Sequence, residues 1–280
     1  MSAYRFCRTD DIGLLVDALN RCWAPHFPGE PPMTPDAFKR SIRGLQVWCS
    51  SCMVAFSGSD PIGVLIGAKR PSGTLVHRIA VHPDHLRQGH GRHLLTSLGS
   101  KLSILGPPRM AAEVPEAFTA ACDLFGACGY VQEAILTDYV LEDPEHEATQ
   151  LAGLFVIPVT VDDLAANGLL GPDSDVCWER SVETLTARKN DIAGLAIASD
   201  ERIEAYVLYA EDGEVLSLRT LIEDGGARLG LLLGRLRAGG VNAFHLPKAH
   251  PAEIPGELLE ALGFRPGAGY RLYAAKARAE

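Results

Sequence analysis

Two kinds of apolar pattern alternate along the chain. Short β-branched segments bounded by Gly, Pro, Asp or Ser predict strands, and leucines three, four and seven positions apart predict amphipathic helices. In the first half, strands are expected at 52–57, 62–69, 74–81, 109–114 and 133–141, and helices at 91–105 and 115–128. In the second half, strands are expected at 192–198, 203–209, 214–221, 242–246 and 270–275, and helices at 226–238 and 251–262. The order of elements agrees between the halves, which predicts an α/β fold built twice.

A sequence repeat supports this organisation. Residues 124–130 and 258–264 both read Leu-x-x-Ala-x-Gly-aromatic, 134 positions apart. The segment between the copies is charged, poor in apolar residues and contains a proline, as linkers are. We therefore expect two tandem domains, at 1–143 and 152–280, joined by a linker at 144–151. Chance similarity between leucine-rich helices is the alternative.

The composition is that of a globular protein. With 280 residues, 47% hydrophobic and 22% charged, the chain is neither disordered nor collagen-like. Its longest apolar stretch, around 151–161, contains Pro158 and is shorter than the ~20 residues of a membrane span. No apolar run follows the N-terminus as in a signal peptide. We expect a cytoplasmic protein without membrane association.

The seven cysteines form an odd set in a long chain, which favours reduced thiols over a disulfide framework. Cys49 and Cys52 make a solitary CxxC. A zinc site would need a second pair, and a redox site a strand–CxxC–helix context, so we interpret both as ordinary cysteines.

Negative charge is concentrated in the second half. Residues 1–143 carry 13 Lys and Arg against 14 Asp and Glu, whereas residues 144–280 carry 13 against 21. Neither half is basic enough to indicate a nucleic-acid partner. A phosphate-bearing ligand is expected in the first half, where repulsion is weaker.

A glycine-rich turn at 82–91 leads from the strand at 74–81 into the helix that follows. The first N–H groups of a helix lack partners within it and lie at the positive end of its dipole. Gly89 and Gly91 have no Cβ, so a phosphate can approach these groups closely. The cationic and titratable residues around the turn are Arg87, Arg92 and the histidines at 82, 85, 90 and 93. The turn therefore predicts an anion site, with a purely structural helix cap as the alternative.

Other site signatures do not fit this turn. It lacks the Gly-Lys-Ser/Thr of a Walker loop and the third glycine of a dinucleotide-binding fingerprint. His90 and His93 share a helix face, but Asp84 is the sole nearby carboxylate, so we expect no metal.

Ile-Ala-Val-His-Pro at 79–83 with Arg-Gln-Gly-His-Gly-Arg at 87–92 resembles the acetyl-CoA-binding signature of GNAT-superfamily N-acetyltransferases. The repeat segment at 124–130 resembles their second motif, and the resemblance covers most of residues 4–141. It implies a mixed, splayed β-sheet flanked by helices in each domain, with acetyl-CoA as co-substrate between two central strands. The implied contacts are main-chain groups of Ile79, Ala80 and Val81 for pantetheine, and amides of Arg87, Gln88, Gly89, His90, Gly91 and Arg92 for pyrophosphate.

The second copy keeps the element order without the signature, which resembles tandem members of the superfamily with a degenerate second domain. At the repeat offset, Gly89 becomes Glu223 and His90 becomes Asp224. Two carboxylates would repel a pyrophosphate, so we expect one acetyl-CoA per chain, in the first half.

The residues at the usual catalytic positions differ from those typical of the family. Phe125 stands where the family usually has a tyrosine general acid, and we count it among the expected cofactor contacts. Loss of a general acid slows a reaction ~10²–10⁴-fold without preventing it. Strand alternation over 75–81 places His77 on the face of Ile79, and some family members carry a catalytic histidine or carboxylate on this strand. His77 is the first candidate base, Glu113 the second, and a packed histidine the alternative.

The acceptor is not identified by the sequence. Residues 20–56 correspond to the variable acceptor region of the family, and their side chains line the acceptor pocket or belong to the core. The candidates are Trp23, His26, Phe27, Trp48 and Phe56.

The sequence predicts an N-acetyltransferase whose N-terminal domain moves an acetyl group from acetyl-CoA to a small-molecule or peptide primary amine by direct attack. A CoA-binding sensor or scaffold without turnover is the alternative, and a longer acyl-CoA donor remains open.

Overall fold

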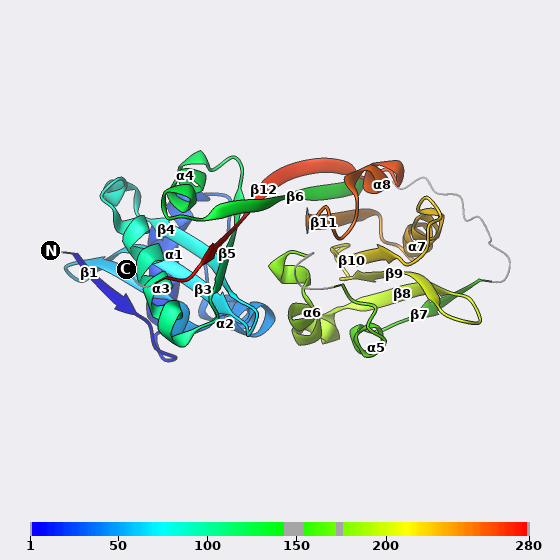
Figure 1. Ribbon diagram of the computed structural model, residues 1–280, viewed down its shortest axis with the longest axis horizontal. Helices are drawn as coiled ribbons and strands as arrows, with labels where there is room; N and C mark the ends of the chain where they lie inside the picture. Colours follow the sequence, from blue (N-terminus) through cyan, green and yellow to red (C-terminus); the bar gives the residue numbers. More distant parts are fainter. Residues whose placement is uncertain (1, 143–153, 172–175, 279–280) are drawn as a thin grey trace. The chain divides into compact units, whose positions relative to one another are not determined.

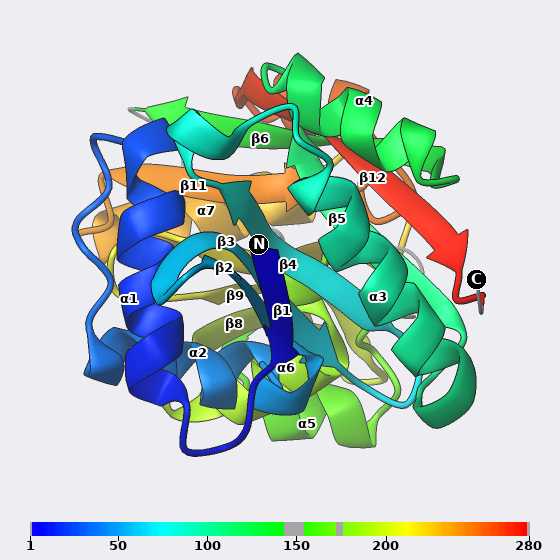
Figure 2. The same cartoon turned by 90° about the vertical axis from the view of Figure 1, so that its left-hand side faces the viewer.

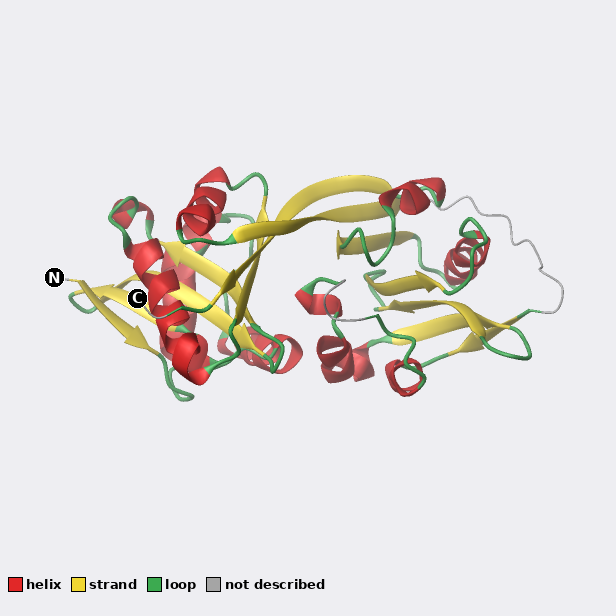
Figure 3. Ribbon diagram, viewed as in Figure 1, coloured by secondary structure: helices red, strands yellow, loops and turns green. Residues whose placement is uncertain are grey.

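A computed structural model describes residues 2–142, 154–171 and 176–278. The chain forms two compact units, one of Met1–Glu133 with Arg271–Glu280 and the other of Ala134–Tyr270. Strands β6 (Val131–Glu142) and β12 (Arg265–Lys276) run side by side, and each begins in one unit and ends in the other (Figures 1 and 3). The predicted linker at 144–151 lies outside the described residues. The predicted ranges 1–143 and 152–280 stay a prediction about the two sequence copies.

Unit 1 contains a mixed sheet in the order β1-β2-β3-β4-β5-β12. Its strands are β1 (Ser2–Phe6), β2 (Met53–Ser57), β3 (Asp60–Lys69), β4 (Thr74–Val81) and β5 (Arg109–Pro115). Its helices are α1 (Ile12–Cys22), α2 (Pro35–Leu45), α3 (His90–Leu105) and α4 (Thr119–Ala127). Figure 2 shows α1 and α3 on opposite sides of the central strands. Leu94, Leu95, Leu98 and Leu102 are buried, as the leucine spacing predicts.

The two central parallel strands part shortly after they meet. β4 and β5 pair at Thr74 with Met110 and at Leu75 with Ala111, although both strands continue for several residues. Beyond these pairs the edges of the two strands no longer bond to each other, and a gap opens. The predicted splayed sheet is confirmed.

The register between β3 and β4 shifts at His77. Consecutive residues of β3 pair with Arg78 and Val76, so His77 is the extra residue of a β-bulge. Val76 and Ile79 therefore pack against the same core cluster although they are three positions apart. The predicted strict alternation over residues 75–81 is wrong, because the bulge changes which face the residues beyond it occupy.

Unit 2 has a four-stranded antiparallel sheet in the order β10-β9-β8-β7. The strands are β7 (Phe155–Pro158), β8 (Ala193–Ala198), β9 (Ile203–Tyr209) and β10 (Val215–Thr220), while β11 (Ala243–Ala249) pairs with β6. The helices are α5 (Val161–Ala166), α6 (Val182–Arg188), α7 (Ala227–Ala238) and α8 (Gly256–Ala261). A bridge between Glu214 and His245 is parallel, like the pairing of β4 and β5.

The repeated Gly-aromatic motif has the same geometry in both units. Gly129 and Gly263 have φ of 80° and 91°, the left-handed conformation that glycine adopts without strain. Tyr130 N–H donates to Phe125 O at 3.1 Å, and Phe264 N–H donates to Leu259 O at 3.0 Å. Each helix thus ends in a Schellman motif whose last residue is a buried aromatic.

Two predicted helices begin later than the pattern indicated. α4 begins at Thr119 rather than 115, because Pro115 belongs to β5 and to the turn that Phe118 N–H closes on its carbonyl. α8 begins at Gly256 rather than 251, because Pro255 has no N–H and sits ahead of the first helical turn.

Candidate active site

A cavity of about 220 Å³ in unit 1 is bounded by both parting strands. β4 contributes Ile79, Ala80 and Val81, and β5 contributes Val114 and Pro115. Further lining residues are Trp23, His26, Phe27, Leu86, Gly91, Phe118, Ala120, Ala121 and Leu124. The walls are almost entirely apolar, which suits a thioester and its alkyl arm.

The main chain of β4 presents polar groups to this cavity. His82 N–H donates to Ile62 O of β3 at 2.9 Å. Because alternate residues of a strand direct their main-chain groups to opposite edges, the N–H and C=O of Ile79 and Val81 point toward the gap, and those of Ala80 toward β3. Nε2 of His26 donates to the Val81 carbonyl oxygen at 2.9 Å, in keeping with this direction.

The N-terminus of α3 lies at the same cavity through Gly91. Gly89 is the N-cap, with φ of 86° and open space around the position of a Cβ. The first intrahelical bond runs from His93 N–H to Gly89 O at 3.0 Å, so the amides of residues 90–92 precede it. A Cβ on Gly91 would lie 3.0 Å from Leu124 Cδ2, so this glycine lets α4 approach α3 closely.

His90 has a buried side chain beside these amides. Its Nδ1 lies 2.6 Å from the Tyr4 hydroxyl, and its buried Nε2 has no hydrogen-bond partner among the described residues. Burial, together with His85 and His93, lowers the pKa of His90 and favours the neutral imidazole. The N–H groups of residues 90–92 have no partner within α3, and the space beside Gly89 is open, so this turn fits a phosphate group.

The side chains of Arg87, Gln88 and Arg92 are exposed around the turn. Arg87 has φ of 61°, a conformation that a residue other than glycine or asparagine rarely adopts. Of the predicted cofactor residues at 79–81 and 87–92, Ile79, Ala80, Val81 and Gly91 line the cavity. The others belong to the turn and helix start that adjoin it.

The structure does not bring the predicted catalytic residues to this cavity. His77 occupies the bulge of β4, and Glu113 lies on the face of β5 opposite the buried Met110, Ala112 and Val114. Phe125 is buried in the core, 5.0 Å from the Tyr130 ring and 5.9 Å from the Tyr273 ring, and does not line the cavity. At the position where the family usually has a tyrosine general acid, this chain therefore has a phenylalanine that packs in the core.

The expected acceptor region divides into two parts. Trp23, His26 and Phe27 line the cavity, whereas Trp48 is 54% exposed and neither it nor Phe56 does. The rings of Trp23 and Phe27 stack at 4.2 Å, and Phe27 lies 4.9 Å from Phe118. The Arg78 guanidinium lies 4.8 Å from the centroid of the Trp23 ring, and Trp23 Nε1 donates a hydrogen bond to Glu30 at 3.1 Å.

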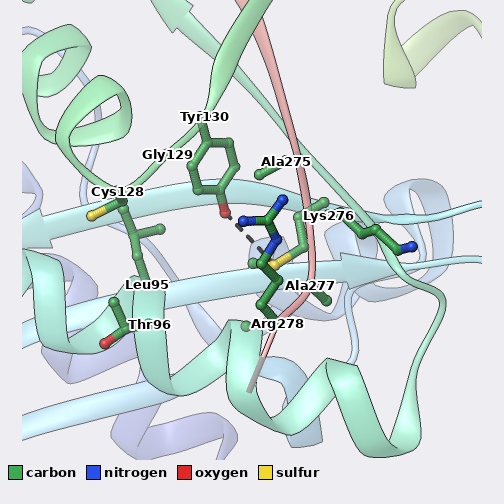
Figure 4. Close-up of a pocket in the computed structure, with 11 residues that line it drawn as sticks. Leu95, Thr96, Cys128, Gly129, Tyr130, Ala275, Lys276, Ala277 and Arg278 are labelled. Carbon is green, nitrogen blue, oxygen red and sulfur yellow. Dashed lines mark hydrogen bonds between the residues drawn. The ribbon is translucent and has the colours of Figure 1, made fainter. Parts of the chain in front are cut away.

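A second cavity of about 220 Å³ in unit 1 lies between α3, β5 and the C-terminal strand (Figure 4). Tyr130 directs its hydroxyl to the Met110 sulfur at 3.8 Å, and burial raises the pKa of this tyrosine. None of the predicted site residues lines this cavity.

The corresponding helix start in unit 2 is occupied by a carboxylate. Gly226 is the N-cap of α7 and has φ of 86°. The repeat offset of 134 pairs the N-cap Gly89 with residue 223, so α7 begins about one turn later than that offset indicates. Asp224 accepts hydrogen bonds from the N–H of Gly226 at 3.0 Å and of Arg228 at 2.9 Å. Burial opposes ionisation of Asp224, but these bonds and the Arg228 guanidinium lower its pKa. Two main-chain N–H groups at the start of α7, those of Gly226 and Arg228, therefore already bind a carboxylate of the chain itself.

No group of three or more His, Cys, Asp or Glu within the described residues is arranged to hold a metal ion. In the same residues, no helix is both long and apolar enough to traverse a bilayer.

Residues 15–130 match the family model described as the acetyltransferase (GNAT) family, and no curated protein matches the chain. Among solved structures, a GCN5-related N-acetyltransferase from Sphaerobacter thermophilus aligns with a TM-score of 0.71 and 16% identity, over 99% of this chain and 96% of that one. A tandem GNAT protein from the clavulanic acid biosynthesis pathway aligns with a TM-score of 0.66 and 18% identity over 100% of both chains. At these identities, the structural likeness shows the fold.

Proposed function

Because residues 15–130 carry a GNAT acetyltransferase domain, we propose that this protein transfers the acetyl group of acetyl-CoA to a primary amine in unit 1. This proposal is supported by the cavity between β4 and β5, whose apolar walls adjoin the first N–H groups of α3, which have no partner within the helix. A pantetheine arm and a pyrophosphate need these two environments next to each other.

In this proposal, different residues bind the two parts of acetyl-CoA. The main chain of Ile79 and Val81 binds the pantetheine amides and directs an N–H toward the thioester oxygen, where it stabilises the developing oxyanion. The amides following Gly89 bind the pyrophosphate, with Arg87 and Arg92 as exposed cations nearby. Acetyl-CoA supplies the activated acetyl group, and the amine, a small molecule or a peptide, attacks its carbonyl carbon directly.

Turnover without a tyrosine acid is chemically reasonable, because the leaving group is a thiolate whose thiol has a pKa near 8.5 in ordinary surroundings. The proposal includes one acetyl-CoA per chain, since the Asp224 carboxylate already accepts from two N–H groups at the corresponding helix start in unit 2.

The test is release of free CoA thiol from acetyl-CoA in the presence of a library of primary amines, with the acetylated products identified by mass spectrometry. We expect amine-dependent release and a stoichiometry of one by calorimetry. Two sites per chain would contradict the assignment to unit 1.

A CoA-binding module without turnover is the second candidate, because Phe125 is a core residue and no hydroxyl side chain lines the cavity within the described part of the chain. Tight binding of acetyl-CoA without thiol release for any amine would favour it.

A further inference from the structure

His26 has a place in the cavity that the family resemblance does not assign. It ends the short 3₁₀ helix Ala24–His26 that follows α1, and its ring lies against the main chain of β4. Among the side chains that line the described cavity, it is the one with an imidazole, whose neutral form has a nitrogen that can accept a proton.

The hydrogen bond to Val81 determines which ring nitrogen is basic. A carbonyl oxygen only accepts, so Nε2 of His26 carries the hydrogen in the 2.9 Å contact. In a neutral imidazole the other nitrogen, Nδ1, then has a lone pair, and it has no hydrogen-bond partner among the described residues. A general base needs a nitrogen with an available lone pair, and the hydrogen bond from Nε2 leaves Nδ1 of His26 in this state.

The same hydrogen bond holds the imidazole against the edge of β4 that faces the gap. Val81 is one of the two β4 residues whose main chain faces the gap, and its carbonyl anchors the imidazole there. The stacked rings of Trp23 and Phe27 flank His26 in sequence and line the same cavity. An amine that enters along these rings reaches the imidazole and the thioester together.

From this geometry we infer that His26 is the general base that removes a proton from the acceptor amine. The inference rests on the proposed acetyl transfer. The amine nitrogen forms a bond to the acetyl carbon, the carbon–sulfur bond breaks, and Nδ1 takes one proton from the nitrogen. The CoA thiolate then takes a proton from the imidazolium, directly or through water, which restores neutral His26.

The experiment compares wild type with His26→Gln, which retains an N–H donor for Val81 but has no basic nitrogen. Transfer to the best amine of the library is measured as acetylated product, together with acetyl-CoA affinity by calorimetry. We expect kcat to fall by ~10²–10⁴-fold, as for loss of a general base, with the acetyl-CoA Kd changed less than about twofold. His245→Gln, at an exposed histidine of β11, is the matched control and should transfer at the wild-type rate.

His26→Ala adds a readout that a structural role would not move, because imidazole in solution should restore formation of the acetylated amine. If His26→Gln fails to fold, as judged by loss of acetyl-CoA binding, His26→Asn takes its place in the same comparison. His77→Gln and Glu113→Gln are measured alongside, as the other candidate bases.

The outcomes separate the two proposals. Wild-type transfer with kcat unchanged in His26→Gln overturns the role of His26 and leaves the acetyltransferase function standing. Wild-type binding of acetyl-CoA without transfer to any amine overturns both.

Discussion

Replacing Gly89 by alanine tests whether the start of α3 binds the cofactor through its main chain. Gly89 has φ of 86°, and nothing lies within 4 Å of the position of its Cβ. The substitution therefore causes no clash, but it forces an L-residue into a left-handed conformation, which costs ~1–2 kcal/mol. The smaller entropy of the unfolded alanine chain offsets ~0.4–1 kcal/mol of this. We expect a net destabilisation of about 1 kcal/mol.

The effect on binding should be larger than the effect on folding. The added methyl group projects into open space beside the amides of residues 90–92, where the proposed site receives a phosphate. Loss of one hydrogen bond to a charged group costs ~1.5–3 kcal/mol. Since ~1.4 kcal/mol is tenfold in affinity, the Kd of acetyl-CoA should rise about 10- to 150-fold.

Gly58 provides the matched control. It also has positive φ, 62°, and no atom within 4 Å of its Cβ position, but it lies in the turn between β2 and β3. Urea denaturation should show a similar loss of stability for Gly58→Ala and Gly89→Ala, and calorimetry should show weakened acetyl-CoA binding for Gly89→Ala alone. Equal affinities in the two variants would refute the main-chain anion site.

Two further predictions concern unit 2. Asp224→Ala removes the carboxylate at the start of α7 and should cost ~0.5–2 kcal/mol, whereas Glu223→Ala, at the exposed neighbour, should cost little. Because the folded-state pKa of Asp224 is lowered, its contribution to the free energy of unfolding is complete above the ordinary carboxyl pKa of ~3.9 and declines as the pH falls through the folded-state value. A difference in stability between wild type and Asp224→Ala that does not change with pH in urea denaturation would contradict this prediction. In the folded protein the buried Arg180 guanidinium lies 2.5 Å from the Glu253 carboxylate. Glu253→Gln removes that negative charge and should lower the free energy of unfolding by ~3–5 kcal/mol. Glu257→Gln, at an exposed position of α8, should not, and equal thermal stability of the two variants would count against the ion pair.

The sequence was sufficient for features that depend on local interactions. The glycine-rich turn, the leucine face of α3 and the Gly-aromatic helix ends could be read directly, because a left-handed glycine or a helical apolar spacing has its cause within a few residues. The splayed strands followed from the family resemblance and were confirmed by the pairing of β4 with β5.

Three features depended on contacts between distant parts of the chain. The bulge at His77 arises from the register of β4 against β3, which no pattern within β4 reveals. The last strand, β12, enters unit 1 through residues 271–276, because a strand pairs with whichever open edge it can bond. His26 meets the Val81 carbonyl across 55 positions of sequence. The sequence by itself predicted an anion site at the start of α3, while the tertiary structure decided that His26 lies against the main chain of β4, because hydrogen bonds and strand registers between remote segments form only once the chain has folded.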